Sequence, residues 1–233
     1  MIGRHVKLND IVLNKYGFVE SVEYPEFSFE KIYKERALKP SEFDKYIRTH
    51  KAVTVYFRII KETIKDSRNA LDTVKSYLTY LEPMSFVLDE KKHCQVVIDS
   101  IESEEVNNAI LATLNLINLD GVWYSEIKKI SVANGKLELK TNTIIDSDKF
   151  KITAKPNTNF ISIKDSIGNV IEPFINNNLN SITIDFEKKL VTQSGRFIPV
   201  KLNSNFFKLR KENLILFESL SNIVVEYREV VDL

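Results

Sequence analysis

Residues 52–60 read AVTVYFRII, and this stretch gives the clearest indication that the fold is built on a β-sheet. Its residues alternate strictly between apolar and more polar side chains. Because successive side chains of a strand point to opposite faces of a sheet, this alternation predicts a β-strand with one buried face. We expect that buried face to carry Val53, Val55, Phe57 and Ile59.

The segment that follows changes to helical spacing. Its apolar residues recur every three to four positions, which predicts an amphipathic helix over residues 66–81. Asp66 or Ser67 can cap its first turn, and Pro83 ends it. The apolar stripe, which we expect to pack on a sheet, consists of Ala70, Leu71, Val74, Leu78 and Leu81.

Other parts of the first half also favour strands. Residues 27–29 and 94–98 alternate in the same way as residues 52–60. Residues 106–119 fit either a buried helix or a strand, and we favour the strand. Residues 102–105, which are rich in glutamate, are expected to form a charged loop. Residues 120–125 read as a turn that carries Trp123 and Tyr124.

After residue 128 the chain consists of short β-rich runs separated by polar turns, with no helical stripe. Asn134-Gly135 is a typical hairpin turn. Such spacing favours an antiparallel sandwich. We therefore predict an α+β, mainly β protein with two domains, residues 1–130 and 131–233. The expected C-terminal strands are 137–140, 150–154, 160–164, 182–186, 190–192, 198–202, 214–217 and 223–227.

Composition excludes several classes of function. Lys plus Arg is 33 and Asp plus Glu is 32 in 233 residues, so the net charge of +1 gives no sign of a nucleic-acid binder. The six glycines are too far apart for a phosphate-binding loop or a dinucleotide fingerprint. One cysteine and three histidines do not supply a zinc site. We expect no cofactor, no metal and no membrane segment, and find no signal peptide pattern.

Two chemical sites are conceivable from the residues alone. Asp185 and Glu187, two apart on an expected strand, would share a face, as a glycosidase pair might require, although such pairs usually come from different strands. Trp123 and Tyr124 would suit a platform on which a sugar stacks or, more simply, they would pack in the hydrophobic core. Phe206 and Phe207 are adjacent, so at least one of them is expected in the core.

The last third of the chain carries a more specific pattern. It reads SITIDFEKKLVTQ at 181–193, IPVKLNSNFFKLRKENLILF at 198–217 and NIVVEYREVVDL at 222–233. These runs resemble the C-terminal stretch of the siphophage distal tail protein family (Dit). One departure is that Arg210, Lys211 and Glu212, rather than a Pro-Gly pair, precede Asn213. The residues that carry the resemblance are Asp185, Asn205, Phe206, Phe207, Leu209, Asn213, Tyr227 and Arg228.

The resemblance implies a fold and a structural role. Dit proteins form a six-fold ring at the tail tip of the virion, with a central channel for the genome, between the tail-tube protein and the tail-associated or fibre-base protein. Their N-terminal domain builds the ring with a helix and a belt-like hairpin, here residues 25–51. Their galectin-like C-terminal sandwich docks receptor-binding proteins. Expected ring-interface residues are Phe27, Phe29, Ile32, Tyr33, Lys75 and Tyr77.

This interpretation predicts a non-enzymatic protein that is made in the bacterial host cytoplasm. The chief alternative is a monomeric carbohydrate-binding or adhesin module that uses Trp123, Tyr124 and exposed aromatic residues. A glycoside hydrolase that uses Asp185 with a distant glutamate is a third hypothesis.

Overall fold

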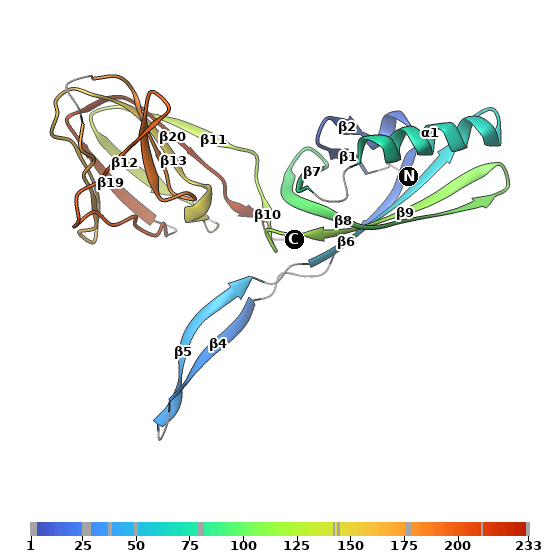
Figure 1. The fold of residues 1–233 in the computed structure, drawn as a ribbon, viewed down its shortest axis with the longest axis horizontal. Helices are drawn as coiled ribbons and strands as arrows, with labels where there is room; N and C mark the ends of the chain where they lie inside the picture. Colours follow the sequence, from blue (N-terminus) through green and yellow to red (C-terminus); the bar gives the residue numbers. More distant parts are fainter. Residues whose placement is uncertain are drawn as a thin grey trace. The chain divides into compact units, whose positions relative to one another are not determined.

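The protein is described by a computed structural model covering residues 4–24, 29–36, 39–48, 51–78, 82–141, 143, 145–175, 179–210 and 212–231. The chain divides into two compact units, shown in Figure 1. Unit 1 comprises Met1–Glu126 and Val231–Leu233, and unit 2 comprises Ile127–Val230. Unit 2 thus begins before the expected residue 131, and the end of the chain returns to unit 1.

Unit 1 is built on a nine-stranded antiparallel sheet in which the central strands follow the order β2-β1-β7-β8-β9-β6-β3. β10 pairs with β8 beside this path, and a short 3-10 helix, η1 (Leu13–Lys15), follows β2. The strands are β1 (Val6–Leu8), β2 (Ile11–Val12), β3 (Phe18–Glu23), β6 (Lys51–Ile60), β7 (Met84–Leu88), β8 (Lys92–Val106), β9 (Ala109–Asn118), β10 (Trp123–Tyr124) and β21 (Val230–Val231).

β6 shows the predicted alternation of buried and more exposed side chains. The side chains of Val53, Val55, Phe57 and Ile59 are buried, and the residues between them are more exposed. The ambiguous segment is strand β9, paired with β6 along its whole length, so the strand interpretation is confirmed. The prediction of a charged loop at residues 102–105 is wrong. These residues extend β8, because their backbone pairs with β9 up to a tight turn at Asn107 and Asn108.

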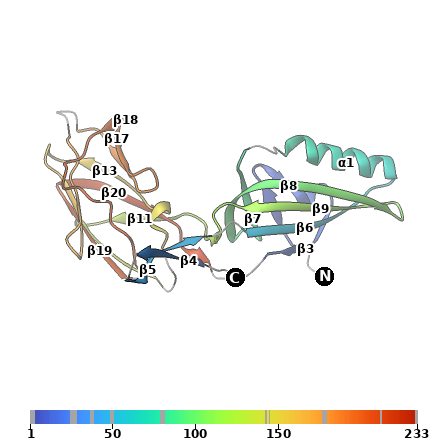
Figure 2. The ribbon, with the colours of Figure 1, turned by 60° about the horizontal axis from the view of Figure 1, so that its bottom comes forward.

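One face of this sheet is covered by α1 (Ile64–Tyr77), which packs over β6 and β9 (Figure 2). The helix starts earlier than predicted because Thr63 is its N-cap: its hydroxyl accepts a hydrogen bond from the Asp66 N–H at 3.1 Å. It ends at Tyr77 because Leu78 already has an extended backbone. The expected last turn at residues 79–81, including Leu81, lies outside the described residues.

The belt-like segment contains a hairpin of two antiparallel strands, β4 (Phe29–Arg36) and β5 (Lys39–Arg48). Within the described chain these two strands pair only with each other and form a separate two-stranded sheet. Residues 25–28, with Phe27, lie outside the described residues. A two-stranded hairpin without further strands is marginally stable in water, so β4 and β5 need something else to pack against.

Unit 2 is an antiparallel β-sandwich, as predicted. A six-stranded sheet with the order β11-β20-β13-β16-β17-β18 faces a four-stranded sheet with the order β12-β19-β14-β15 (Figure 2). One hydrophobic core contains side chains from both sheets. The elements are β11 (Lys128–Val132), β12 (Lys136–Lys140), η2 (Ser147–Lys149), β13 (Lys151–Pro156), β14 (Ser162–Asp165), β15 (Val170–Ile171), β16 (Ile182–Asp185), β17 (Leu190–Gln193), β18 (Arg196–Ile198), β19 (Glu212–Glu218) and β20 (Leu220–Tyr227).

Two local predictions in unit 2 were wrong. Asn134 and Gly135 do adopt positive φ angles, 58° and 64°, but the turn joins β11 of one sheet to β12 of the other, so no hairpin forms. The strand expected at 198–202 ends at Ile198 instead. Pro199 lacks an N–H, and beyond it the chain makes only an isolated bridge between Val200 and Pro173.

Candidate functional site

The residues expected at a ring interface occupy two separate elements of unit 1. Phe29, Ile32 and Tyr33 lie on β4, where their backbones pair with Arg48, Lys45 and Phe43 of β5. The ladder shifts register between Ile32 and Tyr33. Whether these residues contact another subunit stays a prediction.

The other two expected interface residues lie in the last turn of α1. The side chain of Tyr77 is 56% exposed, and Lys75 is half-buried. Because these residues are two positions apart on a helix, they point in different directions. The structure therefore does not bring them together into one patch, and their role in an interface also stays a prediction.

Several residues that carry the family resemblance meet in the core of unit 2. The ring of Phe186, which follows β16, makes edge-on contacts with three other rings. Its centroid lies 5.3 Å from Phe206, 5.1 Å from Phe207 and 5.0 Å from Phe150. Phe207 and Leu209 are buried, and Phe206 packs against the core. The expectation that at least one of the adjacent phenylalanines is in the core is confirmed.

The asparagines of the pattern shape the backbone around this cluster. Asn213 accepts a hydrogen bond from the Arg210 N–H at 2.7 Å and donates one to the Arg210 carbonyl oxygen. Its side-chain amide thus closes a turn at the start of β19. The Asn205 N–H donates to the Val170 carbonyl oxygen at 2.7 Å, and its side-chain amide donates to the Asn169 side chain at 3.3 Å.

The remaining pattern residues, Asp185, Tyr227 and Arg228, line one shallow hollow of about 250 Å³ beside Lys149 and Glu187. Tyr227 is buried, and its removal from water raises the pKa of its phenol. The acidic and basic side chains around it are partly paired with each other, as in the 3.1 Å contact between Lys149 Nζ and Glu187 Oε1. Asp185 and Tyr227 are the last residues of β16 and β20, and Arg228 follows β20 directly.

The structure does not support Asp185 and Glu187 as a glycosidase pair on one strand face. Asp185 is the last residue of β16, whereas Glu187 lies in the turn after it, so the two do not share a strand face. Asp185 accepts a hydrogen bond from the Lys188 N–H at 3.0 Å, which closes that turn. Both carboxylates thus have local partners.

Trp123 and Tyr124 form part of a buried core rather than a sugar platform. Their side chains are 2% and 1% exposed. The Trp123 ring lies edge-on to Tyr24 at 5.5 Å and tilted against Phe86 at 5.4 Å. A carbohydrate-binding surface that used these two rings is therefore excluded by their burial.

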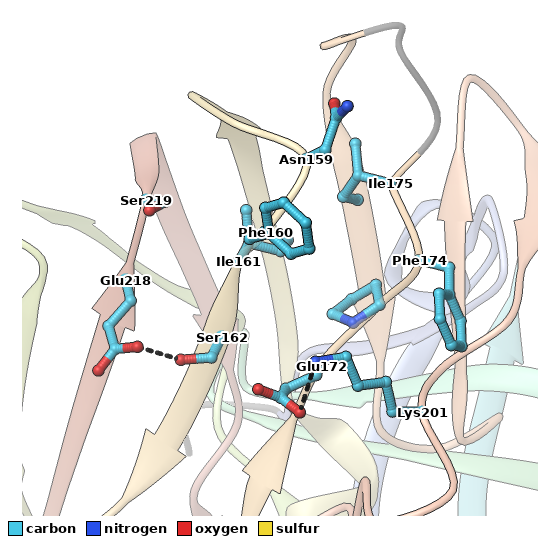
Figure 3. Close-up of a pocket in the computed structure, with 11 residues that line it drawn as sticks. Asn159, Phe160, Ile161, Ser162, Glu172, Phe174, Ile175, Lys201, Glu218 and Ser219 are labelled. Carbon is cyan, nitrogen blue, oxygen red and sulfur yellow. Dashed lines mark hydrogen bonds and ion pairs between the residues drawn. The ribbon is translucent and has the colours of Figure 1, made fainter.

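Unit 2 also has a surface hollow of about 280 Å³, shown in Figure 3, that was not predicted from the sequence. Phe160, before β14, and Phe174, after β15, stand on its walls and are 81% and 52% exposed. Glu218, Glu172 and Lys201 supply its charged groups. The only signal in the sequence was that both phenylalanines adjoin turn residues, Asn159 and Pro173.

Metal binding and thiol chemistry would depend on the His, Cys, Asp and Glu side chains of the described residues. Among them, no group of three or more His, Cys, Asp or Glu side chains is placed to hold a metal ion. Cys94 is buried, and burial raises the pKa of its thiol, which makes it a poor nucleophile. No helix in this part of the chain is long and apolar enough to span a membrane.

Comparison with known proteins identifies the fold. No protein-family model and no curated protein matches the sequence. The solved structure of the Dit protein of phage SPP1, described as a paradigm of the hub adsorption apparatus in phages that infect Gram-positive bacteria, matches with a TM-score of 0.78 at 13% identity. The match covers 97% of this chain and 98% of that protein.

A chain in the structure of the phage P2 baseplate in its activated conformation is also similar. Its structure with calcium matches with a TM-score of 0.60 at 9% identity, over 100% of this chain and 99% of the other. Its structure with strontium gives 0.58 at 9% identity, over 98% and 99%. The chain therefore has the fold of a phage distal tail protein, which confirms the resemblance seen in its last third.

Proposed function

We propose that this protein is the distal tail hub of a long-tailed phage or prophage, a structural protein without catalytic activity. In this role, six copies close into a ring around a channel for the genome at the tail tip. The tail-tube protein binds one side of the ring, and the tail-associated or fibre-base protein binds the other. Receptor-binding proteins dock on unit 2.

The observation that carries this proposal is the full-length match to a hub protein. The similarity to SPP1 Dit extends over 97% of this chain and includes both units, rather than one sandwich alone. β-Sandwiches of the galectin type serve many functions, so unit 2 alone would say little. The combination with a helix-covered sheet and a separate hairpin is far more specific.

The β4–β5 hairpin gives independent support. It forms a two-stranded sheet of its own in the described chain, which is a weak arrangement for a monomer. A ring needs contacts between two different surfaces of identical subunits, and an extended hairpin that reaches a neighbouring subunit supplies one of them.

The experiment that tests the proposal is a measurement of mass in solution by light scattering over a concentration series, with negative-stain images of the largest species. We expect a six-membered ring with an open centre, in the protein alone or after addition of the tail-tube protein. A variant in which a short flexible linker replaces residues 29–48 should stay monomeric.

Fluorescence of Trp123, the single tryptophan, reports whether unit 1 of that variant remains folded. Phe197→Ser, on the surface of unit 2, is the control that should still form rings. A wild-type protein that stays monomeric with the tail-tube protein present would contradict the hub role.

A further inference from the structure

Unit 1 has a long unpaired strand edge on β8. β7 pairs with β8 only from Lys92 to Val96, whereas β9 pairs with it as far as Val106. From Val97 to Val106 the side of β8 that faces away from β9 therefore has no partner strand within the described chain (Figure 1). We call this stretch the β8 edge. An open strand edge of this length is a template for pairing with a further strand.

The turn at the end of the β8 edge shows which of its backbone groups point outward. Asn107 and Asn108 have φ angles of 47° and 64°, which is typical of a two-residue hairpin turn. The flanking residues of such a turn, here Val106 and Ala109, form a hydrogen-bonded pair, and bonded and non-bonded pairs then alternate along the ladder. The residues that direct their N–H and C=O groups away from β9 are therefore Ile101, Ser103 and Glu105.

The β8 edge is acidic. It contains no lysine or arginine and four carboxylates, which belong to Asp99, Glu102, Glu104 and Glu105. Glu105 forms an ion pair with Arg68 of α1, and Glu102 accepts a hydrogen bond from the neutral Asn115 amide at 3.4 Å. Three carboxylates thus have no cationic partner among the described residues. Because like charges on facing strands destabilise a sheet, two such edges should not pair with each other, whereas a basic strand is favoured.

The β4–β5 hairpin can supply such a strand. Residues 29–48 contain six basic and four acidic residues, a net charge of +2. The two strands have eight and ten residues and pair only with each other in the described chain, so the outer edge of each is free. The hairpin therefore matches the β8 edge in length and in charge, and it needs a further strand for its own stability.

Other free edges in the described chain fit the β8 edge less well. β3, at the end of the sheet of unit 1, is itself acidic and is interrupted by a bulge between Val19 and Ser21. β11 and β12 have only five residues each. The two lysines of β11 already pair with Glu229 and Glu226, at 2.8 and 2.6 Å.

The hairpin that reaches the β8 edge must come from a second copy of the chain. Only two residues separate β5 from β6, so Arg48 lies within about 11 Å of Lys51. A strand added to the β8 edge would lie three strand spacings from β6, about 14 Å, because β9 and β8 come between. β5 of the same chain therefore cannot lie along this edge.

We infer that the β8 edge of one copy binds the β4–β5 hairpin of a second copy as a strand added to the sheet of unit 1. This inference rests on the proposed function and names the surface that receives the hairpin. The contact joins two different surfaces of identical chains, so its repetition from copy to copy can close a ring.

The test separates the two halves of this contact. Ser103→Pro removes an outward N–H and leaves the ladder with β9 intact, so this variant keeps the hairpin but loses the receiving edge. The linker variant that lacks residues 29–48 keeps the edge but loses the hairpin. In analytical ultracentrifugation we expect each variant alone to be monomeric and their equimolar mixture to form a one-to-one dimer.

Ser103→Ala is the matched control, because it keeps the N–H, and it should assemble as the wild type does. Fluorescence of Trp123 checks that unit 1 of each variant is folded. Asp99→Lys combined with Glu104→Lys should weaken the mixed dimer severalfold, and less so at high salt.

Hydrogen exchange gives a second readout that needs no substitution in the β8 edge. In the wild-type ring, the amides of Ile101, Ser103 and Glu105 should exchange about tenfold or more slowly than in the linker variant. The free edge of β11 is the control and should exchange at the same rate in both.

Two results would overturn the inference and leave the hub role intact. One is a Ser103→Pro variant that forms rings as the wild type does, and the other is unchanged exchange at residues 97–106 in a wild-type ring. A mixture that stays monomeric while the wild type forms rings would also exclude the contact. A wild type that never forms rings, even with the tail-tube protein, contradicts the hub, whereas a mixed dimer in that case would still support the contact.

Discussion

The sheet of unit 1 has one apolar face under α1 and one mostly polar face that also carries Leu111 and Ile117, whereas the two sheets of unit 2 bury their apolar faces against each other. On the polar face of unit 1, Asn115 donates to Ser100 Oγ at 2.9 Å, and Arg58 pairs with Glu20 at 2.6 Å. Unit 2 thus completes its own core, while unit 1 leaves a polar sheet face and a hairpin without further strands. In the proposed hub, unit 1 would supply the assembly contacts and unit 2 the docking surface.

The largest expected effect tests whether the two cores are independent. Phe186→Ala removes the ring at the centre of the aromatic cluster in unit 2 and should lower the unfolding free energy of that unit by about 3–5 kcal/mol. Trp123 lies in the core of unit 1. Its fluorescence transition in urea should therefore stay unchanged, while hydrogen exchange of unit 2 accelerates.

Phe57→Ala is the matched substitution in unit 1, because Phe57 is also a buried phenylalanine in a sheet core. It should move the Trp123 transition and leave hydrogen exchange in unit 2 unchanged. If either substitution shifted both units equally, the two cores would have to unfold as one.

The next two substitutions compare steric crowding at a glycine of unit 1 with backbone strain at a glycine of unit 2. A Cβ atom at Gly17 would overlap the Arg58 carbonyl oxygen and lie 2.9 Å from the Phe57 ring, so Gly17→Ala should destabilise unit 1 by about 1–3 kcal/mol. Gly168 in unit 2 has nothing within 4 Å but has a φ of 93°. Gly168→Ala should cost about 1 kcal/mol from strain alone.

Urea titrations of both variants check these two predictions. Trp123 fluorescence monitors the unfolding of unit 1, and hydrogen exchange monitors that of unit 2. A wild-type transition for Gly17→Ala would show that β3 can move away from β6 at no cost.

A smaller effect concerns the helix that covers the sheet of unit 1. Thr63→Ala removes the side chain that caps α1 and should destabilise unit 1 by about 1 kcal/mol. Thr73→Ala is the control in the same helix, because the Thr73 hydroxyl only donates back to the Asn69 carbonyl oxygen at 2.8 Å. Thermal unfolding followed by Trp123 fluorescence should separate the two, and equal midpoints would contradict the capping role.

The smallest effect is the response to acid. Burial would raise the pKa of Asp89, but the hydrogen bond from the His5 N–H and the contact with Arg4 lower it below its ordinary value of 3.8. A carboxyl whose pKa is lower in the folded state stabilises that state above its ordinary pKa, and this contribution is lost as the pH falls through the folded value. Unit 1 should therefore lose stability below about pH 4.

Asp89→Asn should flatten this acid dependence in Trp123 fluorescence. Glu218→Gln should flatten the acid dependence of unit 2, followed by hydrogen exchange, because the contacts with Lys164 and Ser162 lower the pKa of Glu218. Asp72→Asn, on the exposed side of α1, is the control and should retain the wild-type acid response. An unchanged response in Asp89→Asn would exclude a role for this carboxylate.

Much of the fold followed from local patterns. The alternation in β6 predicted its buried face, and the spacing of Leu71, Val74 and Leu78 predicted the buried stripe of α1. The errors lie where distant partners decide. Glu102–Glu105 belong to β8 because β9 supplies hydrogen-bond partners, and the Asn134-Gly135 turn changes sheets because β19 and β20 lie in different sheets.

The candidate site residues also divide into those that the sequence indicated and those that only the folded structure revealed. The pattern from Asp185 to Arg228 indicated the distal tail fold, and its residues close turns or fill the core, as Asn213 and Phe207 show. Local periodicity depends on near neighbours along the chain, so the amino-acid order alone indicated the main strands, the helix and the mainly β class. The burial of Trp123 and the exposure of Phe160 and Phe174 depend on which distant segments pack beside them, and only the folded arrangement decided those.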